Sequence, residues 1–113
     1  MLHSYSGGAG LVACYRDLGF AFSFAGPVTY ANARKPLEAA RAVPLELLLA
    51  ETDAPDQAPS PHRGSRSEPA YVAHVVAALA AARGLPVDLV AGATATNARR
   101  CFGLGGDEPI ATP

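Results

Sequence analysis

Two polar residues, His3 and Asp53, each end a short apolar run and carry side chains that bind metal ions. An imidazole and a carboxylate together suit a hydrolytic Zn, Mn or Mg site, because the carboxylate can also take a proton from metal-activated water. Taken alone, the pair has a second interpretation. In that interpretation His3 is a partly exposed terminal histidine, and Asp53 only opens a turn before Ala54 and Pro55.

The elements around these residues alternate between short apolar runs and helical patterns. Strands are predicted over residues 1–3, 20–24 and 47–50, and helices over 9–18, 32–42 and 69–83. This alternation is typical of βαβ units and predicts an α/β fold with a parallel sheet. The carboxyl ends of parallel strands meet at one edge, so we expect His3 and Asp53 to lie at the same edge.

The remaining segments carry weaker signals. Residues 54–68 are rich in Pro, Ser, Arg and Gly, which predicts a long loop. A short helix is predicted over 86–93, and a further helical turn over 97–102 is expected to be capped by Thr96. Residues 105–113 are predicted to form a flexible tail.

Composition restricts the chain to one small domain. Its 113 residues carry a net charge of -1, with 50% hydrophobic and 17% charged residues, which is enough apolar surface for a core. No run approaches the ~18 consecutive apolar residues of a membrane span, and no leader pattern is visible, so we expect a cytoplasmic protein without membrane contact. No basic cluster interleaves with aromatic residues, so charge alone does not predict nucleic-acid binding.

The cysteines, Cys14 and Cys101, stand far apart and form no C-x-x-C pair. We expect reduced thiols in the core. A disulfide between them is the alternative that the sequence leaves open.

Five stretches of the chain are similar to motifs of one protein family. Residues 2–7 resemble L-H-C-F-S-G, residues 18–30 resemble L-G-F-Y-I-S-F-S-G-I-V-T-F, and residues 47–55 resemble R-L-L-L-E-T-D-A-P. Residues 59–72 resemble P-x-P-H-R-G-x-x-N-E-P-A-Y-V, and residues 96–103 resemble T-x-N-A-x-x-L-F-G. The family is that of the TatD metal-dependent deoxyribonucleases, which are amidohydrolase-like β/α barrels. The resemblance covers nearly all of residues 2–104.

The resemblance implies that residues 1–104 are the C-terminal part of a (β/α)8 TIM barrel, namely its last three strands with their helices. His3 would end the sixth strand and Asp53 the eighth, and both would bind a divalent metal ion, Mg, Mn or Zn. Asp53 would also be catalytic, because it would help to activate the attacking water. The resemblance implies DNA as the substrate, with cleavage of a phosphodiester bond by either exo- or endonuclease action.

Other residues near the expected site have candidate roles. Arg63, in the H-R-G sequence of the long loop, is a candidate for gripping a substrate phosphate, although its Pro-rich surroundings could simply shape the loop. Ser6 and Gly7 could bind phosphate through a hydroxyl and an amide, or could form an ordinary turn. Glu51 is a candidate to orient loop amides or a metal-binding histidine. His74 is expected at the surface and Tyr71 in packing.

Some positions depart from the family pattern. Tyr5 replaces the usual Phe, Ser67 the usual Asn, and Asp56 a common aromatic residue, which affects the expected substrate contacts more than metal binding. A whole barrel takes ~250 residues. The H-x-H pair, the mid-barrel acidic ligand and the fifth-strand histidine of the family have no counterparts here.

His3 and Asp53 alone fall short of the roughly three protein ligands that a hydrolytic metal site uses. The sequence therefore supports two alternatives to a complete nuclease. One is a catalytically inactive half-barrel fragment, or a structural remnant that depends on a partner, either the missing N-terminal half or a second copy. The other is a hydrolase on the same frame that cleaves a C–N bond, because the metal site alone does not determine the scissile bond.

Overall fold

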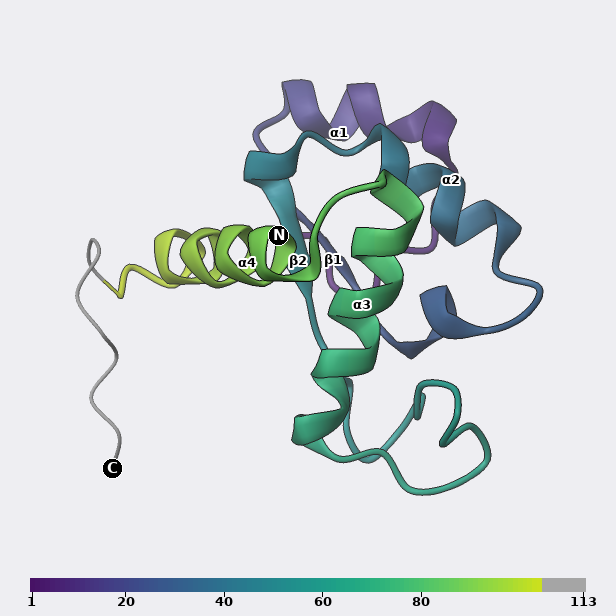
Figure 1. The fold of residues 1–113 in the computed structure, drawn as a ribbon. Helices are drawn as coiled ribbons and strands as arrows, with labels where there is room; N and C mark the ends of the chain where they lie inside the picture. Colours follow the sequence, from purple (N-terminus) through teal and green to yellow (C-terminus); the bar gives the residue numbers. More distant parts are fainter. Residues whose placement is uncertain (105–113) are drawn as a thin grey trace.

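The computed structural model describes residues 1–104, so the predicted tail over 105–113 lies outside the described residues. Figure 1 shows a small α/β structure in which helices surround a short parallel sheet. In chain order its elements are α1 Val12–Asp17, β1 Phe22–Phe24, α2 Arg34–Ala42, β2 Leu48–Ala50, α3 Val72–Arg83 and α4 Val87–Cys101. The long predicted loop contains no helix or strand and connects β2 to the 3₁₀ turn Pro69–Tyr71 before α3.

The sheet has the predicted parallel pairing but shorter strands. β1 and β2 pair in parallel, with Phe22 opposite Leu48 and Phe24 opposite Ala50. Leu2 forms an isolated parallel bridge to Phe22, so the expected first strand is reduced to one residue. Because Phe22 is paired on both sides, β1 lies between Leu2 and β2.

The core lies between the sheet and the helices. Phe22, Leu48, Val75 and Leu79 are fully buried, and each buried side chain of this kind contributes about 1.5–3 kcal/mol. α1, α2 and α3 fall within their predicted ranges. Gly84 follows α3 in the left-handed conformation, with a φ of 64°, as a glycine beyond a helix end commonly does.

The prediction for the last helical region is wrong. In place of a short helix and a capped turn, α4 runs without a break from Val87 to Cys101. The buried Thr94 hydroxyl is satisfied inside the helix, because it donates a hydrogen bond of 2.9 Å to the Val90 carbonyl. Thr96, the expected cap, is an exposed residue within the helix.

The expected burial of the cysteines is also wrong. Cys14 on α1 and Cys101 at the end of α4 are both exposed, and both are free thiols. Each occupies a helix position that faces away from the core. The alternative of a disulfide between them is therefore absent from the structure.

No single helix of residues 1–104 is long and apolar enough to cross a membrane. The segments Pro69–Arg83 and Val87–Cys101 meet the length and composition test only as a pair, and this pair is bent by 114°.

Asn97 on α4 ties the helix to the start of β2. Its side-chain amide is buried and donates two hydrogen bonds of 2.8 Å, one to the Leu45 carbonyl and one to the Leu48 carbonyl. Both carbonyls belong to the segment that leads through β2 to the carboxyl edge of the sheet. The asparagine of the T-x-N-A motif therefore has a structural role in holding β2.

Replacing Asn97 with alanine is expected to lower the free energy of unfolding by about 2–4 kcal/mol, because two carbonyls would lose their donors in a dry environment. Urea unfolding followed by circular dichroism measures this change. The matched control is Thr96→Ala on the exposed side of α4, which should shift stability by no more than about 0.5 kcal/mol. Equal effects of the two substitutions would contradict the role of Asn97.

Candidate metal centre

Backbone pairing brings His3 and Asp53 to the same edge of the sheet. Leu2 is paired with Phe22, and β2 continues through a hydrogen bond of 2.9 Å from the Glu51 amide to the Phe24 carbonyl. Both chain segments therefore leave the sheet in the same direction. His3 Nε2 lies 3.3 Å from Asp53 Oδ1, which agrees with the expected meeting of the two residues.

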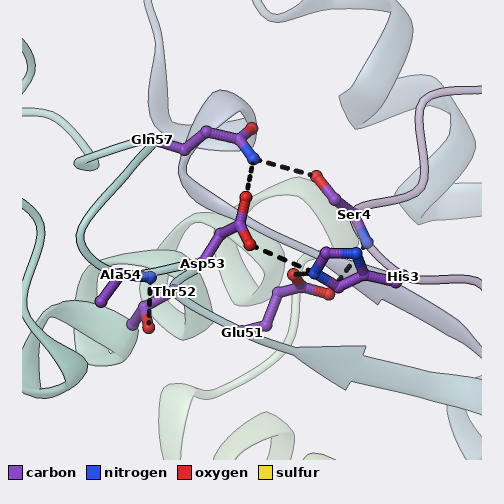
Figure 2. Close-up of polar contacts among 7 residues, drawn as sticks. All are labelled: His3, Ser4, Glu51, Thr52, Asp53, Ala54 and Gln57. Carbon is purple, nitrogen blue, oxygen red and sulfur yellow. Dashed lines mark hydrogen bonds and ion pairs between the residues drawn. The ribbon is translucent and has the colours of Figure 1, made fainter.

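Glu51 contributes a third donor atom to this cluster. Its Oε1 lies 2.7 Å from His3 Nε2, and its Oε2 accepts a hydrogen bond of 2.9 Å from the Ser4 amide (Figure 2). Nitrogen or oxygen atoms of His3, Glu51 and Asp53 lie within 4.8 Å of one another. One carboxylate thus both orients the loop backbone and faces the imidazole.

The chemistry of these three donors fits a divalent cation. Glu51 Oε1 is buried and receives no well-directed hydrogen bond in the described part of the chain, although His3 Nε2 is close to it. A buried carboxylate oxygen without a donor is costly unless a cation or a proton satisfies it. His3 is the most accessible of the three, with 62% of its side chain exposed, which leaves a side open to solvent. Imidazole and carboxylate ligands suit Zn and Mn, and carboxylates suit Mg.

Gln57 holds the far side of the Asp53 carboxylate. Its side-chain amide donates to Asp53 Oδ2 and to Ser4 Oγ, the latter at 3.3 Å (Figure 2). With Oδ2 engaged in this way, Oδ1 is left facing His3. The amide of Gln57 thereby fixes the orientation of the carboxylate.

The same three residues have unusual backbone conformations. Ser4, Asp53 and Gln57 have positive φ values of 45°, 57° and 50°, in the left-handed region that non-glycine residues rarely adopt. Such conformations cost roughly 1–3 kcal/mol each and persist where surrounding contacts impose them, often at functional sites. Their clustering around the donors marks this edge of the sheet as the candidate site.

The long loop is anchored on the 3₁₀ turn Gly26–Thr29. Thr29 Oγ1 accepts a hydrogen bond of 2.8 Å from the Ser60 amide, and the Tyr30 hydroxyl donates to the Ala58 carbonyl at 3.0 Å. Gly26 lies so close to the loop that a Cβ added there would be 2.0 Å from the Gln57 carbonyl oxygen. Only a residue without a side chain allows this approach.

The described residues show no hydrogen bond or ion pair between the other predicted substrate-binding residues and the three donors. Arg63 is exposed, and its guanidinium lies 3.8 Å above the ring of Tyr30. Ser6 and Gly7 border a shallow groove together with His3. The phosphate-binding roles of these residues stay predictions.

Aromatic side chains form two packed groups, one between the long loop and the start of α3 and one around Tyr5. His62 stacks on Tyr71 with ring centres 4.0 Å apart, which agrees with the packing role expected of Tyr71, and the half-buried His74 meets the edge of His62. The Tyr5 hydroxyl donates to the Gly8 carbonyl. Burial raises the pKa of Tyr5 above its ordinary value, and the neighbouring Tyr15 adds to this rise.

The sequence interpretation missed Ser4 and Gln57 and gave Glu51 only a supporting role. One signal was available for Glu51, because Glu51 and Asp53 have the i, i+2 spacing that places side chains on one face at a strand end. Ser4 and Gln57 carry no comparable signal. Their contacts depend on how two separate loops fold.

The chain was also compared with known proteins. The family model described as TatD related DNase matches residues 1–103. The chain belongs to the TatD family. This membership was expected from the sequence motifs and is confirmed by the match.

Two TatD relatives are described as uncharacterized metal-dependent hydrolases. YabD of Bacillus subtilis is 38% identical over 102 residues, which cover 90% of this chain and 40% of the relative. TatD of Mycobacterium tuberculosis is 41% identical over 105 residues, which cover 93% of this chain and 40% of the relative. The chain thus spans about two fifths of the length of these relatives.

A solved TatD structure has a similar fold. The crystal structure of YJJV, a TatD homologue from Escherichia coli K12, superposes with a TM-score of 0.78 and 33% sequence identity. The match covers 86% of this chain and 38% of the crystallised one. The α/β arrangement around the donors is therefore the arrangement of part of a TatD protein.

The close approach at Gly26 yields a test with two opposite outcomes. Gly26→Ala is expected to lower the free energy of unfolding by about 1–3 kcal/mol, because the new methyl group would overlap the loop backbone. Gly92→Ala in α4 meets open space, so it should raise stability by about 0.5–1 kcal/mol. Denaturant unfolding of both variants checks this, and a stabilising Gly26→Ala would show that the loop does not pack as described.

Proposed function

We propose that this chain forms part of the divalent-metal centre of a TatD hydrolase that cleaves phosphodiester bonds in DNA. The observation that carries the proposal is the convergence of His3 Nε2, Glu51 Oε1 and Asp53 Oδ1 at the carboxyl edge of the sheet. Membership of a family described as TatD related DNase supports the choice of reaction.

Each residue has a distinct task in the proposed reaction. A divalent ion, when bound, supplies a Lewis acid that polarises the phosphate and favours ionisation of water. His3, Glu51 and Asp53 would hold the ion, and the Asp53 carboxylate would also accept the proton from the attacking water. Gln57 keeps Asp53 in the orientation that this proton transfer needs.

Glu51 changes the number of protein ligands available. Hydrolytic metal sites typically use three protein ligands and an open position. His3, Glu51 and Asp53 supply three donor residues, so we propose that one ion binds to this chain without ligands from elsewhere. Glu51 then acts as a ligand as well as an orienting group.

We further propose that the sheet continues into a (β/α)8 barrel. In the described residues β2 pairs only with β1, so its outer edge is available to another strand. Exposed strand edges of this kind invite pairing. The companion strands would come from a further barrel segment or from a second copy of the chain.

A catalytically inactive half-barrel is the alternative, and the unpaired edge of β2 is the observation that favours it. In this alternative the chain folds and can bind a metal ion, but DNA is cleaved only after a partner completes the sheet. Metal binding and DNA cleavage must therefore be measured separately.

One prediction of the proposed function concerns metal binding. Isothermal titration of the chain with Mn²⁺ or Zn²⁺ should give one ion per chain. His3→Ala, Glu51→Gln and Asp53→Asn should each weaken binding by about 10- to 100-fold or more. Asp56→Asn removes an exposed carboxylate from the same loop and should leave the affinity unchanged. Wild-type affinity in all three donor variants would refute the proposed centre.

Another prediction of the proposed function concerns catalysis. We expect cleavage of fluorescently labelled DNA to require Mg²⁺ or Mn²⁺, to stop on chelation, and to be lost in Asp53→Asn. Asp56→Asn again serves as the control and should retain activity. Metal binding without DNA cleavage would favour the inactive half-barrel, whereas cleavage that survives both chelation and Asp53→Asn would exclude the proposed mechanism.

A further inference from the structure

A cavity of about 240 Å³ opens beside the metal centre. Gln57, whose amide holds Asp53, and Ser4, whose hydroxyl accepts a hydrogen bond from the same amide, also line this cavity. Figure 2 shows both side chains next to Asp53, on the side away from Glu51. A molecule in the cavity would therefore be separated from Asp53, a proposed metal ligand, by a single side chain, that of Gln57.

The cavity walls are mainly apolar. Phe24 and Val28 are buried core residues that form part of the wall, and the ring of Tyr5 packs edge-on against Phe24 at 5.9 Å. Ligand sites commonly combine such walls with a few polar groups that set orientation. The volume lies just under the ~300–1,000 Å³ range of pockets for drug-sized ligands, so it suits one monomer unit of a polymer.

Lys35 gives the cavity its charge. It is the only charged side chain that lines it, and it makes no ion pair in residues 1–104. It lies on the first turn of α2, and its Cε would be 3.5 Å from a Cβ placed at Gly8. The lysine thus extends from α2 to the loop that follows His3. A compact ammonium group in this position favours a phosphate.

The start of α2 adds to this preference for an anion. No side chain caps the helix, which has nine residues, and both Lys35 and Pro36 from its first turn line the cavity. The amino end of a helix carries a partial positive charge that attracts phosphate. Apolar walls, the polar side chains of Ser4, Ser6 and Gln57, and one cationic end together match a phosphorylated nucleoside.

We infer that this cavity binds the nucleoside next to the scissile phosphate and that Lys35 binds the 5′-phosphate of this nucleoside. This inference rests on the proposed function and names the part of the substrate that the chain recognises. The ring system packs against the apolar wall, in which Pro27 and Pro36 are partly exposed in front of the buried Phe24 and Val28. Ser4 Oγ and the Gln57 amide are the polar groups within reach of the sugar or the edge of the base.

The test is a titration of the full chain without divalent metal, followed by amide chemical shifts in two-dimensional NMR. The probes are thymidine 5′-monophosphate, thymidine, deoxyribose 5-phosphate and inorganic phosphate. The monophosphate should bind at least about tenfold more tightly than any other probe, because it alone engages both the walls and Lys35. Its shifts should centre on the residues that line the cavity.

Three variants on the first turn of α2 provide the matched comparison. Lys35→Gln should weaken binding of the monophosphate by about tenfold, the effect of losing one charge-assisted hydrogen bond. Arg34→Gln removes the adjacent charge, which pairs with Glu38 away from the cavity, and should leave binding unchanged. Lys35→Arg keeps the charge and should keep most of the affinity.

Several results would overturn the inference. These are the absence of binding by any probe, equal binding of phosphate and nucleotide, and equal effects of Lys35→Gln and Arg34→Gln. Tight binding of deoxyribose 5-phosphate would assign the cavity to a sugar phosphate instead of a nucleoside. Because no metal or turnover is involved, a failure here is distinguishable from a failure of the metal centre.

Discussion

The contact between Gly26 and the Gln57 carbonyl is the constraint on which the site depends. A side chain at Gly26 would place a carbon 2.0 Å from that oxygen, so the loop can reach its position only over a glycine. Thr29 and Tyr30 then hold the loop through hydrogen bonds to its backbone. With the loop in place, the Gln57 side chain reaches Asp53 and orients its carboxylate. The orientation of Asp53 at the sheet edge therefore depends on a close packing contact between two backbone segments.

The sheet itself is too short to hold the site alone. β1 and β2 have three residues each, and Leu2 adds a single bridge. Helices make up for this shortness. Asn97 donates to the Leu45 and Leu48 carbonyls at the start of β2, and Arg83 at the end of α3 donates to the carbonyls of Ala40 in α2 and of Val43 just after it. These contacts fix the strands from the helix side. The left-handed conformations of Ser4, Asp53 and Gln57 can therefore be maintained at the carboxyl edge of the sheet.

The sequence predicted the elements that a periodic or continuous pattern of apolar residues marks. Helical periodicity indicated α1, α2 and α3, and apolar runs indicated both strands and the shared edge of His3 and Asp53. Sequence reasoning failed where side-chain contacts outweigh local preference. Thr96, the residue expected to cap a last turn, lies inside α4, and the nearby Thr94 donates its hydroxyl within the same helix. Gln57 and Ser4 meet only because two loops converge, and no periodic pattern encodes such a meeting.

Glu51 determines how the proposed reaction divides between this chain and a partner. With His3 and Asp53 alone, even a single ion would need a further ligand from elsewhere, whereas Glu51 brings the number of donor residues to three. A two-metal centre needs a second set of donors that holds its own ion about 3.5–4 Å from the first, and residues 1–104 offer no other cluster of metal-binding side chains. Binding of the first ion would then be a property of this chain, while any step that requires a second ion would depend on whatever strands pair with the outer edge of β2.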